Sequence, residues 1–178
     1  MRARTVAAAS TAAAAALVLA APTAFAAGPR PAPAAPAATT CLPSALTVSA
    51  SATDQPHVLK ISIKNTGLVP CVVDQIPTVT FGDLDGAAVP VPPAGSAAYP
   101  IGLTRAAYAA VRTVDPADVS TARHVDSVRV AGDPSHPGVS FSATSLGSPD
   151  GVPVWEPVTT LWHPSWDQAE QALQDALG

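Results

Sequence analysis

Proline occurs throughout this chain at a frequency that a mainly helical protein does not tolerate. The 178 residues include 20 prolines and 11 glycines. A proline inside a helix removes a backbone hydrogen-bond donor and clashes with the preceding turn. The chain must therefore be built mainly from strands and turns.

The clearest strand pattern spans residues 57–65, where Leu59, Ile61 and Ile63 alternate with polar side chains. Strict alternation with β-branched residues is typical of a half-buried antiparallel strand. Further strands are expected at residues 46–50, 72–73, 78–81, 87–91, 107–113, 127–131, 139–143 and 152–162. We expect the segment 87–91 to pair back on 78–81, and Pro157 to interrupt the last strand.

Seven or eight short strands, separated by turns at intervals of about 8 to 12 residues, indicate an all-β protein. We interpret the pattern as an immunoglobulin-like antiparallel β-sandwich. Its inner faces are expected to bury Val48, Ile61, Ile63, Val79, Phe81, Val111, Val128, Val130 and Phe141. A short C-terminal helix is expected at residues 166–177, capped by Ser165 and Gln168. Its apolar stripe consists of Trp166, Ala169, Leu173, Ala176 and Leu177, which we expect to dock on the sandwich.

The N-terminal residues carry a targeting pattern rather than a fold pattern. Arg2 and Arg4 precede an apolar run, and Ala24-Phe25-Ala26 then supplies the small residues that a signal peptidase reads. We therefore expect a signal peptide at 1–26, a Pro/Ala-rich linker at 27–40 and one domain at 41–178. No transmembrane segment is expected in the mature chain. The predicted location is extracellular, with association with the cell wall as an option.

Cys41 and Cys71 are the two cysteines of the chain. An even number of cysteines in an exported protein indicates a disulfide, because the compartment is oxidising. The two do not form a Cys-x-x-Cys motif, so a structural bridge is preferred over redox chemistry or metal binding.

Charge argues against a polyanionic partner. The formal net charge is −4 and Lys60 and Lys64 are the only lysines. Binding to a phosphate backbone requires dense positive charge. The sequence therefore predicts no nucleic-acid partner, and the same reasoning disfavours an anionic membrane.

Part of the chain, over about residues 41–113, resembles a known family. The residues that carry the resemblance are Cys41 with Leu46, the strand LKISIKNTG (59–67), Cys71, Pro77, Val79-Thr80-Phe81, Asp85-Gly86 and Gly102-Leu103 leading into 107–111. They resemble the secreted domain of unknown function 4232 of high-GC Gram-positive bacteria. The chain departs from the family pattern at Gln75 and at Thr104-Arg105. The resemblance implies a small β-sandwich with a bridge between the matching cysteines, and it implies no catalytic residue.

No residue pattern predicts a metal site, a cofactor or a catalytic centre. The four histidines, His57, His124, His136 and His163, lack the spacing that places two ligands on one face of a strand or helix. The Asp83-Leu84-Asp85-Gly86 segment opens like a calcium loop, but the later oxygen ligands are missing. The chain has no Gly-x-Ser-x-Gly motif. We therefore expect no enzyme, no metal and no cofactor.

Three tryptophans lie close together near the end of the chain: Trp155, Trp162 and Trp166. They form the candidate binding surface, a flat aromatic platform for sugars or for a protein. The alternative is that Trp162 and Trp166 pack the helix against the sheet, and we prefer this packing for those two residues.

The sequence thus predicts a monomeric, non-enzymatic binding or structural module of the extracellular space or cell envelope. Its expected partner is an extracellular protein or a cell-wall glycan. One alternative is a secreted hydrolase or metal-dependent enzyme with an unrecognised site. Another is a secreted enzyme inhibitor that presents the loop 132–138.

Overall fold

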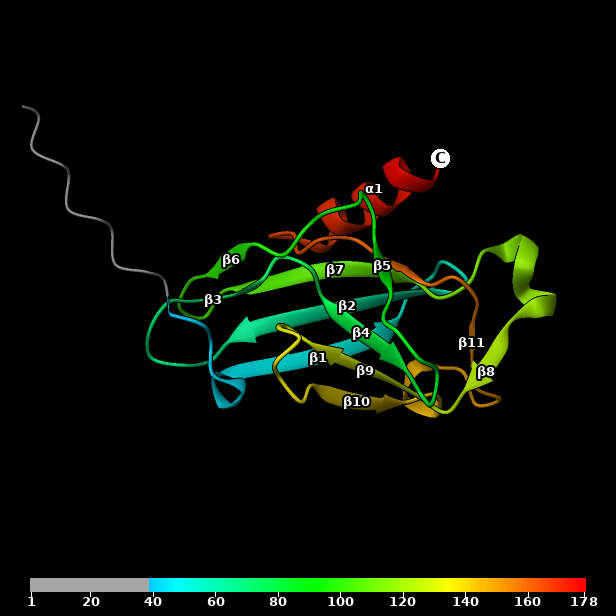
Figure 1. The fold of residues 1–178 in the computed structure, drawn as a ribbon, viewed down its shortest axis with the longest axis horizontal. Helices are drawn as coiled ribbons and strands as arrows, with labels where there is room; N and C mark the ends of the chain where they lie inside the picture. Colours follow the sequence, from blue (N-terminus) through cyan, green and yellow to red (C-terminus); the bar gives the residue numbers. More distant parts are fainter. Residues whose placement is uncertain (1–38) are drawn as a thin grey trace, which may run out of the picture. The chain divides into compact units, whose positions relative to one another are not determined.

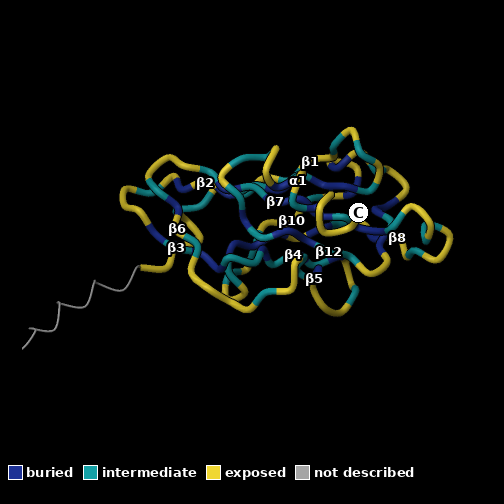
Figure 2. Tube along the Cα trace, turned by 90° about the horizontal axis from the view of Figure 1, so that it is seen from above, coloured by how far each residue is buried: buried dark blue, intermediate teal, exposed yellow. Residues whose placement is uncertain are grey.

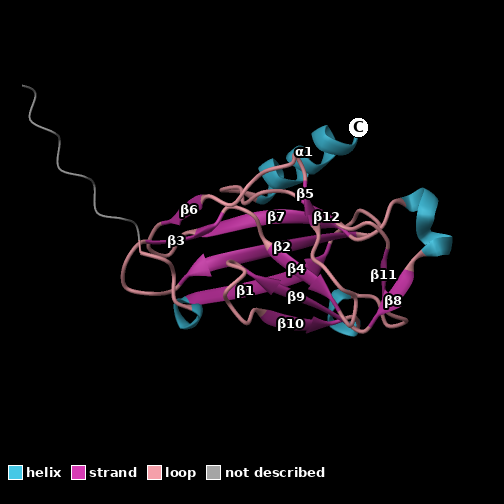
Figure 3. Ribbon diagram, in the orientation of Figure 1, coloured by secondary structure: helices cyan, strands magenta, loops and turns pink. Residues whose placement is uncertain are grey.

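The computed structural model describes residues 39–178, and strands dominate it (Figures 1 and 3). The largest sheet has five strands, in the order β1 (Leu46–Ala52), β2 (Val58–Asn65), β7 (Ala106–Arg112), β12 (Val158–Thr159) and β5 (Val89–Pro90). A second sheet contains β10 (Val139–Ser142), β9 (Ser127–Ala131) and β4 (Thr78–Phe81). Two further pairs are β11 (Val152–Val154) with β8 (Arg123–Val125), and β3 (Cys71–Asp74) with β6 (Ala98–Ile101). Short 3-10 helices occupy η1 (Pro43–Ala45), η2 (Pro116–Thr121) and η3 (Thr144–Leu146), and one α-helix, α1 (Trp166–Leu177), follows β12.

The core forms because apolar residues recur at every second position, and the pleat of a sheet sends alternate side chains to the same face. In β2, Leu59, Ile61 and Ile63 are all buried, and the intervening polar residues face away from them. The buried core residues Val79, Phe81, Val111, Val128 and Val130 belong to the same hydrophobic cluster. Val48 and Phe141 are partly buried and pack against that cluster. The predicted core is therefore confirmed.

Helix α1 covers the other face of the five-stranded sheet. The Ser165 side chain caps the helix by accepting a hydrogen bond from the backbone N–H of Gln168 over 3.4 Å. Ala169 and Leu173 are buried in a second, smaller cluster with Val58 and Ala110. The predicted helix bounds and the docking of its stripe are confirmed, although Ala176 and Leu177 at its end are exposed.

A disulfide joins Cys41 to Cys71, as expected, and both residues are buried. The bridge links neighbouring segments of backbone, because the N–H of Cys41 donates to the carbonyl oxygen of Val72 over 2.8 Å. Thr40 pairs with Val72 in a parallel bridge, so the last residues of the expected linker lie against β3. The expected signal peptide and the linker up to residue 38 lie outside the described residues.

Two expectations about the strands need correction. The interruption expected at Pro157 is present, but it divides residues 152–162 into two strands of different sheets: β11 pairs with β8, whereas β12 joins the five-stranded sheet. The break follows from Glu156, whose φ of 46° turns the chain between them, and from Pro157, which cannot donate a hydrogen bond. The segment near Val89 does not form a ladder with β4, since β5 pairs in parallel with β12.

The expectation of a mainly antiparallel β protein with one disulfide and a C-terminal helix is confirmed. The immunoglobulin-like topology stays a prediction. Among residues 39–178, no helix has the length and apolar character required to cross a bilayer.

Candidate binding site around Trp155

The structure does not bring the three tryptophans into one platform. Trp162 is only 3% exposed and belongs to the main core. Trp166 lies on α1 and packs on the outer face of the sheet, with the Lys60 Nζ atom 5.3 Å from the centre of its ring. Trp166 therefore packs the helix against the sheet, as the alternative interpretation held, whereas Trp162 belongs to the main core and not to the cluster beneath the helix. Trp155 is 43% exposed and is the tryptophan left for a surface site.

The segment between β11 and β12 presents Trp155 outward because its backbone is held on both sides. The N–H of Trp155 donates to the carbonyl oxygen of Thr113 over 2.9 Å. The carbonyl oxygen of Pro157 accepts a hydrogen bond from the N–H of Val89, also over 2.9 Å. Val154 is buried, so alternation along the strand sends the next side chain to the surface. The backbone that carries the indole is consequently held in place by main-chain hydrogen bonds.

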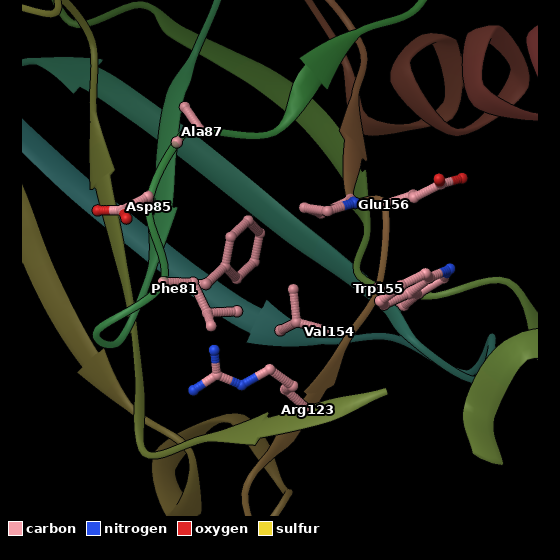
Figure 4. A pocket seen from close by; sticks show the side chains of 10 residues that line it. Phe81, Asp85, Ala87, Arg123, Val154, Trp155 and Glu156 are labelled. Carbon is pink, nitrogen blue, oxygen red and sulfur yellow. The ribbon is translucent and has the colours of Figure 1, made fainter. Parts of the chain in front are cut away.

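One hollow lies between this segment and the end of β4, with a volume of about 390 Å³. Phe81, Leu84 and Val154 provide its apolar surface, and Asp85 and Arg123 provide charge. Figure 4 shows Phe81, Val154 and Arg123 around this hollow, with the Trp155 and Glu156 side chains projecting away from it. The hollow therefore offers both an apolar floor and a guanidinium donor.

The Arg123 guanidinium is available to a ligand. Its Nη2 atom lies 3.8 Å from Oδ2 of Asp83, and both side chains are well exposed. An ion pair of this kind between exposed groups contributes about 0 to 1 kcal/mol. A ligand can therefore displace it at little cost.

A second hollow, of about 490 Å³, lies on the other side of Trp155. Its lining consists of Val89, Arg112, Asp115, Asp118, Trp155, Glu156 and Val158. The Arg112 Nη1 atom donates to Oδ2 of Asp115 over 2.7 Å, while Oδ1 of the same carboxylate accepts from the N–H of Ala117. Asp115 thus caps η2 and orients the guanidinium at the same time.

Trp155 and Glu156 line both hollows and form a ridge between them. The backbone of this ridge is unusual, because Glu156 takes a left-handed conformation that non-glycine residues seldom adopt. Such conformations persist only where the surroundings enforce them, and they are concentrated at functional sites. We call this ridge, together with the two hollows, the Trp155 site.

Comparison with known proteins places the chain in a family. The model of a family described as a domain of unknown function (DUF4232) matches residues 41–162, more than two thirds of the chain. The chain belongs to the DUF4232 family. No curated protein and no solved structure matches it significantly. The DUF4232 match extends the resemblance seen in the sequence well beyond residue 113, to include Trp155 but not α1.

The Asn-x-Gly motif, which carried part of the DUF4232 resemblance, is structural. Asn65 is completely buried, and its Nδ2 atom donates to the carbonyl oxygens of Val69 and Ile101 over 2.9 and 3.2 Å. Its Oδ1 atom accepts from the N–H of Gly67 over 2.9 Å. A Cβ at position 67 would lie 3.0 Å from Cβ of Ala45, which explains the glycine. This motif therefore accounts for a loop and says nothing of a ligand.

Sequence reasoning singled out Trp155 but missed most of its neighbours. Asp85 was noted in a segment that opens like a calcium loop and in the family resemblance, not as a neighbour of Trp155, and Arg112, Asp115, Arg123 and Glu156 carried no signal. These residues come from segments far apart in the sequence, and the pairing of β12 with β7 and β5, together with that of β11 with β8, brings them together. Among residues 39–178, no group of three or more His, Cys, Asp or Glu side chains could hold a metal ion.

The partly buried imidazole of His163 makes the stability of the fold depend on pH. Burial lowers the pKa of this imidazole below its ordinary value, and its backbone exchanges two hydrogen bonds with Tyr108. The unfolded chain takes up the proton near its ordinary pKa of about 6.5, whereas the folded protein takes it up only at lower pH. Between these values the unfolded state binds more protons, so stability falls as the pH falls.

We expect the melting temperature to decrease as the pH is lowered from about 7 to about 5, because the His163 imidazole of the unfolded chain takes up its proton in this range. The decrease should be smaller in His163→Gln than in the parent. The matched control is His124→Gln, because His124 is exposed on β8. An equal pH dependence in all three proteins, measured by thermal melting, would contradict the assignment.

Proposed function

We propose that the protein is a non-enzymatic extracellular binding module of the cell envelope and that it binds a glycan chain across Trp155. The observation that carries this proposal is the exposed, backbone-fixed indole standing between two hollows. Export is supported by the targeting pattern of residues 1–26 and by the buried disulfide.

A sugar ring suits this site because the ring itself has two kinds of surface, an apolar face and a polar edge. Its C–H face stacks on an aromatic ring, and its hydroxyl groups require donors and acceptors around the edge. The indole provides the first, and Arg123, Glu156 and Asp118 provide the second. Ligand pockets span about 300 to 1,000 Å³, so each hollow has room for one ring on either side of the ridge.

Binding rather than catalysis is supported by how the charged groups are already engaged. Both oxygens of Asp115 accept hydrogen bonds, from Arg112 and from the backbone at Ala117. Asp115 therefore orients the Arg112 guanidinium and caps η2.

Replacing Trp155 with alanine is expected to weaken binding to isolated cell-wall polysaccharide by about 30-fold. The estimate follows from the cost of truncating a central aromatic contact, about 2 kcal/mol or more. Trp155→Phe should recover part of the loss because it retains a ring. The measurement is co-sedimentation with the polysaccharide, followed by calorimetry with soluble fragments.

The matched control is Val139→Ala, because Val139 is 42% exposed and lies on β10, outside this site. Equal binding by Trp155→Ala and the parent would overturn the proposal. The proposal would also be overturned if the parent bound no glycan but captured one protein, and if Trp155→Ala lost that capture. Release of sugar products that depends on a single histidine would favour the hydrolase alternative instead.

Inhibition of an extracellular enzyme is a second candidate, favoured by the bracing of loop 132–138. Oδ1 of Asp133 accepts hydrogen bonds from the backbone N–H and the hydroxyl of Ser135, over 2.9 and 2.6 Å. The Ser135 hydroxyl lowers the pKa of Asp133, so its carboxylate stays ionised. An inhibitor would lose potency on replacement of His136 and keep it in Trp155→Ala.

A further inference from the structure

Four large aliphatic side chains at one end of the domain are exposed to solvent instead of being buried in the core. Their exposed fractions are 67% for Leu42, 93% for Leu68, 63% for Val69 and 46% for Leu103. We call these four residues the apolar tip. Figure 2 shows the loops beside β3 and β6, at this end, largely in the colour of exposed residues.

The apolar tip is held together by the backbone around Asn65. Its side chain bonds the carbonyl oxygens of Val69 and Ile101, and its N–H donates to the carbonyl oxygen of Arg105 over 3.0 Å. The N–H of Thr66 donates to the carbonyl oxygen of Ala45, in the segment that carries Leu42. Three segments separated in sequence therefore present their aliphatic residues from one fixed frame.

The charge at this end is positive. The segments that form it, residues 39–49, 64–72 and 98–106, contain Lys64 and Arg105 and no acidic residue. Both basic side chains are exposed. Lys64 is the penultimate residue of β2, directly before Asn65, and Arg105 directly precedes β7, so they flank the apolar residues.

Asp74 on β3 is the acidic residue of the strand pair at this end, but it is only 9% exposed, and its carboxylate accepts hydrogen bonds from the Ser96 hydroxyl and from the N–H of Ile76. Several other acidic residues lie at the opposite end. Asp115 and Asp118 belong to η2 and its cap, and Glu156 follows β11. Figure 1 places β8 and β11 at the end of the domain opposite to β3 and β6. Charges separated by more than about 8 Å are largely screened at physiological ionic strength, so the net negative charge of the chain does not determine the local potential at the tip.

We propose that the apolar tip docks on a lipid membrane that carries anionic headgroups. Exposed aliphatic side chains enter the interfacial layer, while flanking lysine and arginine side chains reach the headgroup phosphates. This revises the expectation, drawn from total charge, that an anionic membrane is disfavoured.

A second copy of the chain is a poorer occupant for the same surface. A two-fold contact would place each tip against its own equivalent. Lys64 and Arg105 of both copies would then face one another around the aliphatic residues, and like charges in such a contact repel. Anionic headgroups complement these groups instead.

The test uses the protein recovered after export and vesicles of equimolar phosphatidylglycerol and phosphatidylcholine. We expect the parent to co-sediment with these vesicles. The partition coefficient of the double variant Leu68→Ser with Val69→Ser should be lower by a factor of about 10 or more. Lys64→Gln and Arg105→Gln should each weaken binding about 5-fold. Their effect should vanish on pure phosphatidylcholine. Leu177→Ser is the matched control, since Leu177 is 37% exposed but lies at the end of α1.

A Leu68→Trp variant gives a second readout, because brominated lipid should quench the added indole if the residue enters the bilayer. Equal sedimentation of the parent and the double serine variant would overturn the proposal, as would absence of quenching. A dimer lost in the double variant, without vesicle binding, would assign the tip to a second copy. Trp155→Ala should still bind vesicles, so this proposal and glycan binding fail separately.

Discussion

Replacing Asn65 with alanine is expected to lower the free energy of unfolding by about 3 kcal/mol or more, since each buried polar group left without a partner costs about 1 to 3 kcal/mol. The substitution removes three hydrogen bonds at once: those to the carbonyl oxygens of Val69 and Ile101, and that from the N–H of Gly67. The effect should also reach β6, because Ile101 pairs with Cys71 at its end.

Urea denaturation of the parent and Asn65→Ala provides the measurement. The matched control is Thr66→Ala, which removes one exposed hydroxyl hydrogen bond to the carbonyl oxygen of Ala45. Exposed substitutions of this kind usually change stability by less than about 0.5 kcal/mol. One buried polar group without a partner costs at least about 1 kcal/mol. If Asn65→Ala loses less than about 1 kcal/mol in free energy of unfolding, the loops do not depend on this residue.

Removing the disulfide is expected to destabilise the fold by about 3 to 4 kcal/mol in the chain-entropy account. The bridge closes a loop with a sequence separation of 30, and this loop contains all of β1 and β2. For a domain of this size the loss corresponds to a fall in melting temperature of about 10 °C. The measurement is thermal and urea unfolding of the double variant Cys41→Ser with Cys71→Ser.

Reductant provides the control. The parent should lose stability in a reductant once unfolding exposes its buried sulfur atoms, whereas the double serine variant should not respond. The free energies of unfolding of the reduced parent and of the variant should then agree within about 0.5 kcal/mol, the usual error of such comparisons. Equal stability of the oxidised parent and the variant would contradict the expectation.

Local patterns predicted much of the fold. Alternation in residues 57–65 identified a strand whose apolar residues are indeed buried, because a half-buried sheet imposes a period of two. The C-terminal helix was predicted at its observed bounds, because Ser165 marks its start and the stripe through Ala169 and Leu173 has helical spacing.

The sequence did not reveal which strands pair. β5 has two residues and β12 has two, and segments this short carry no signal for their partners. β6 contains Pro100, and β8 has three residues, so neither was foreseen. The break at Glu156 depends on a left-handed backbone that a glutamate seldom adopts.

The candidate site was predictable in one residue only. Trp155 was noted because tryptophan is conspicuous, but its exposure follows from the hydrogen bonds that anchor its segment to Thr113 and Val89. The charged residues around it come from β7, η2 and β8, and their convergence is a property of the tertiary structure. The burial of Asn65 was missed for a similar reason, since an Asn-x-Gly turn reads as exposed.

The position of the Cys41–Cys71 bridge also has a mechanical consequence. Tension applied between the two ends of the chain travels along its covalent path, which passes from Cys41 through the sulfur atoms to Cys71. Residues 42–70 lie off that path, so pulling cannot extend them while the bridge is intact. The bridge would thus keep the segment containing β1 and β2 from being drawn out into an extended chain.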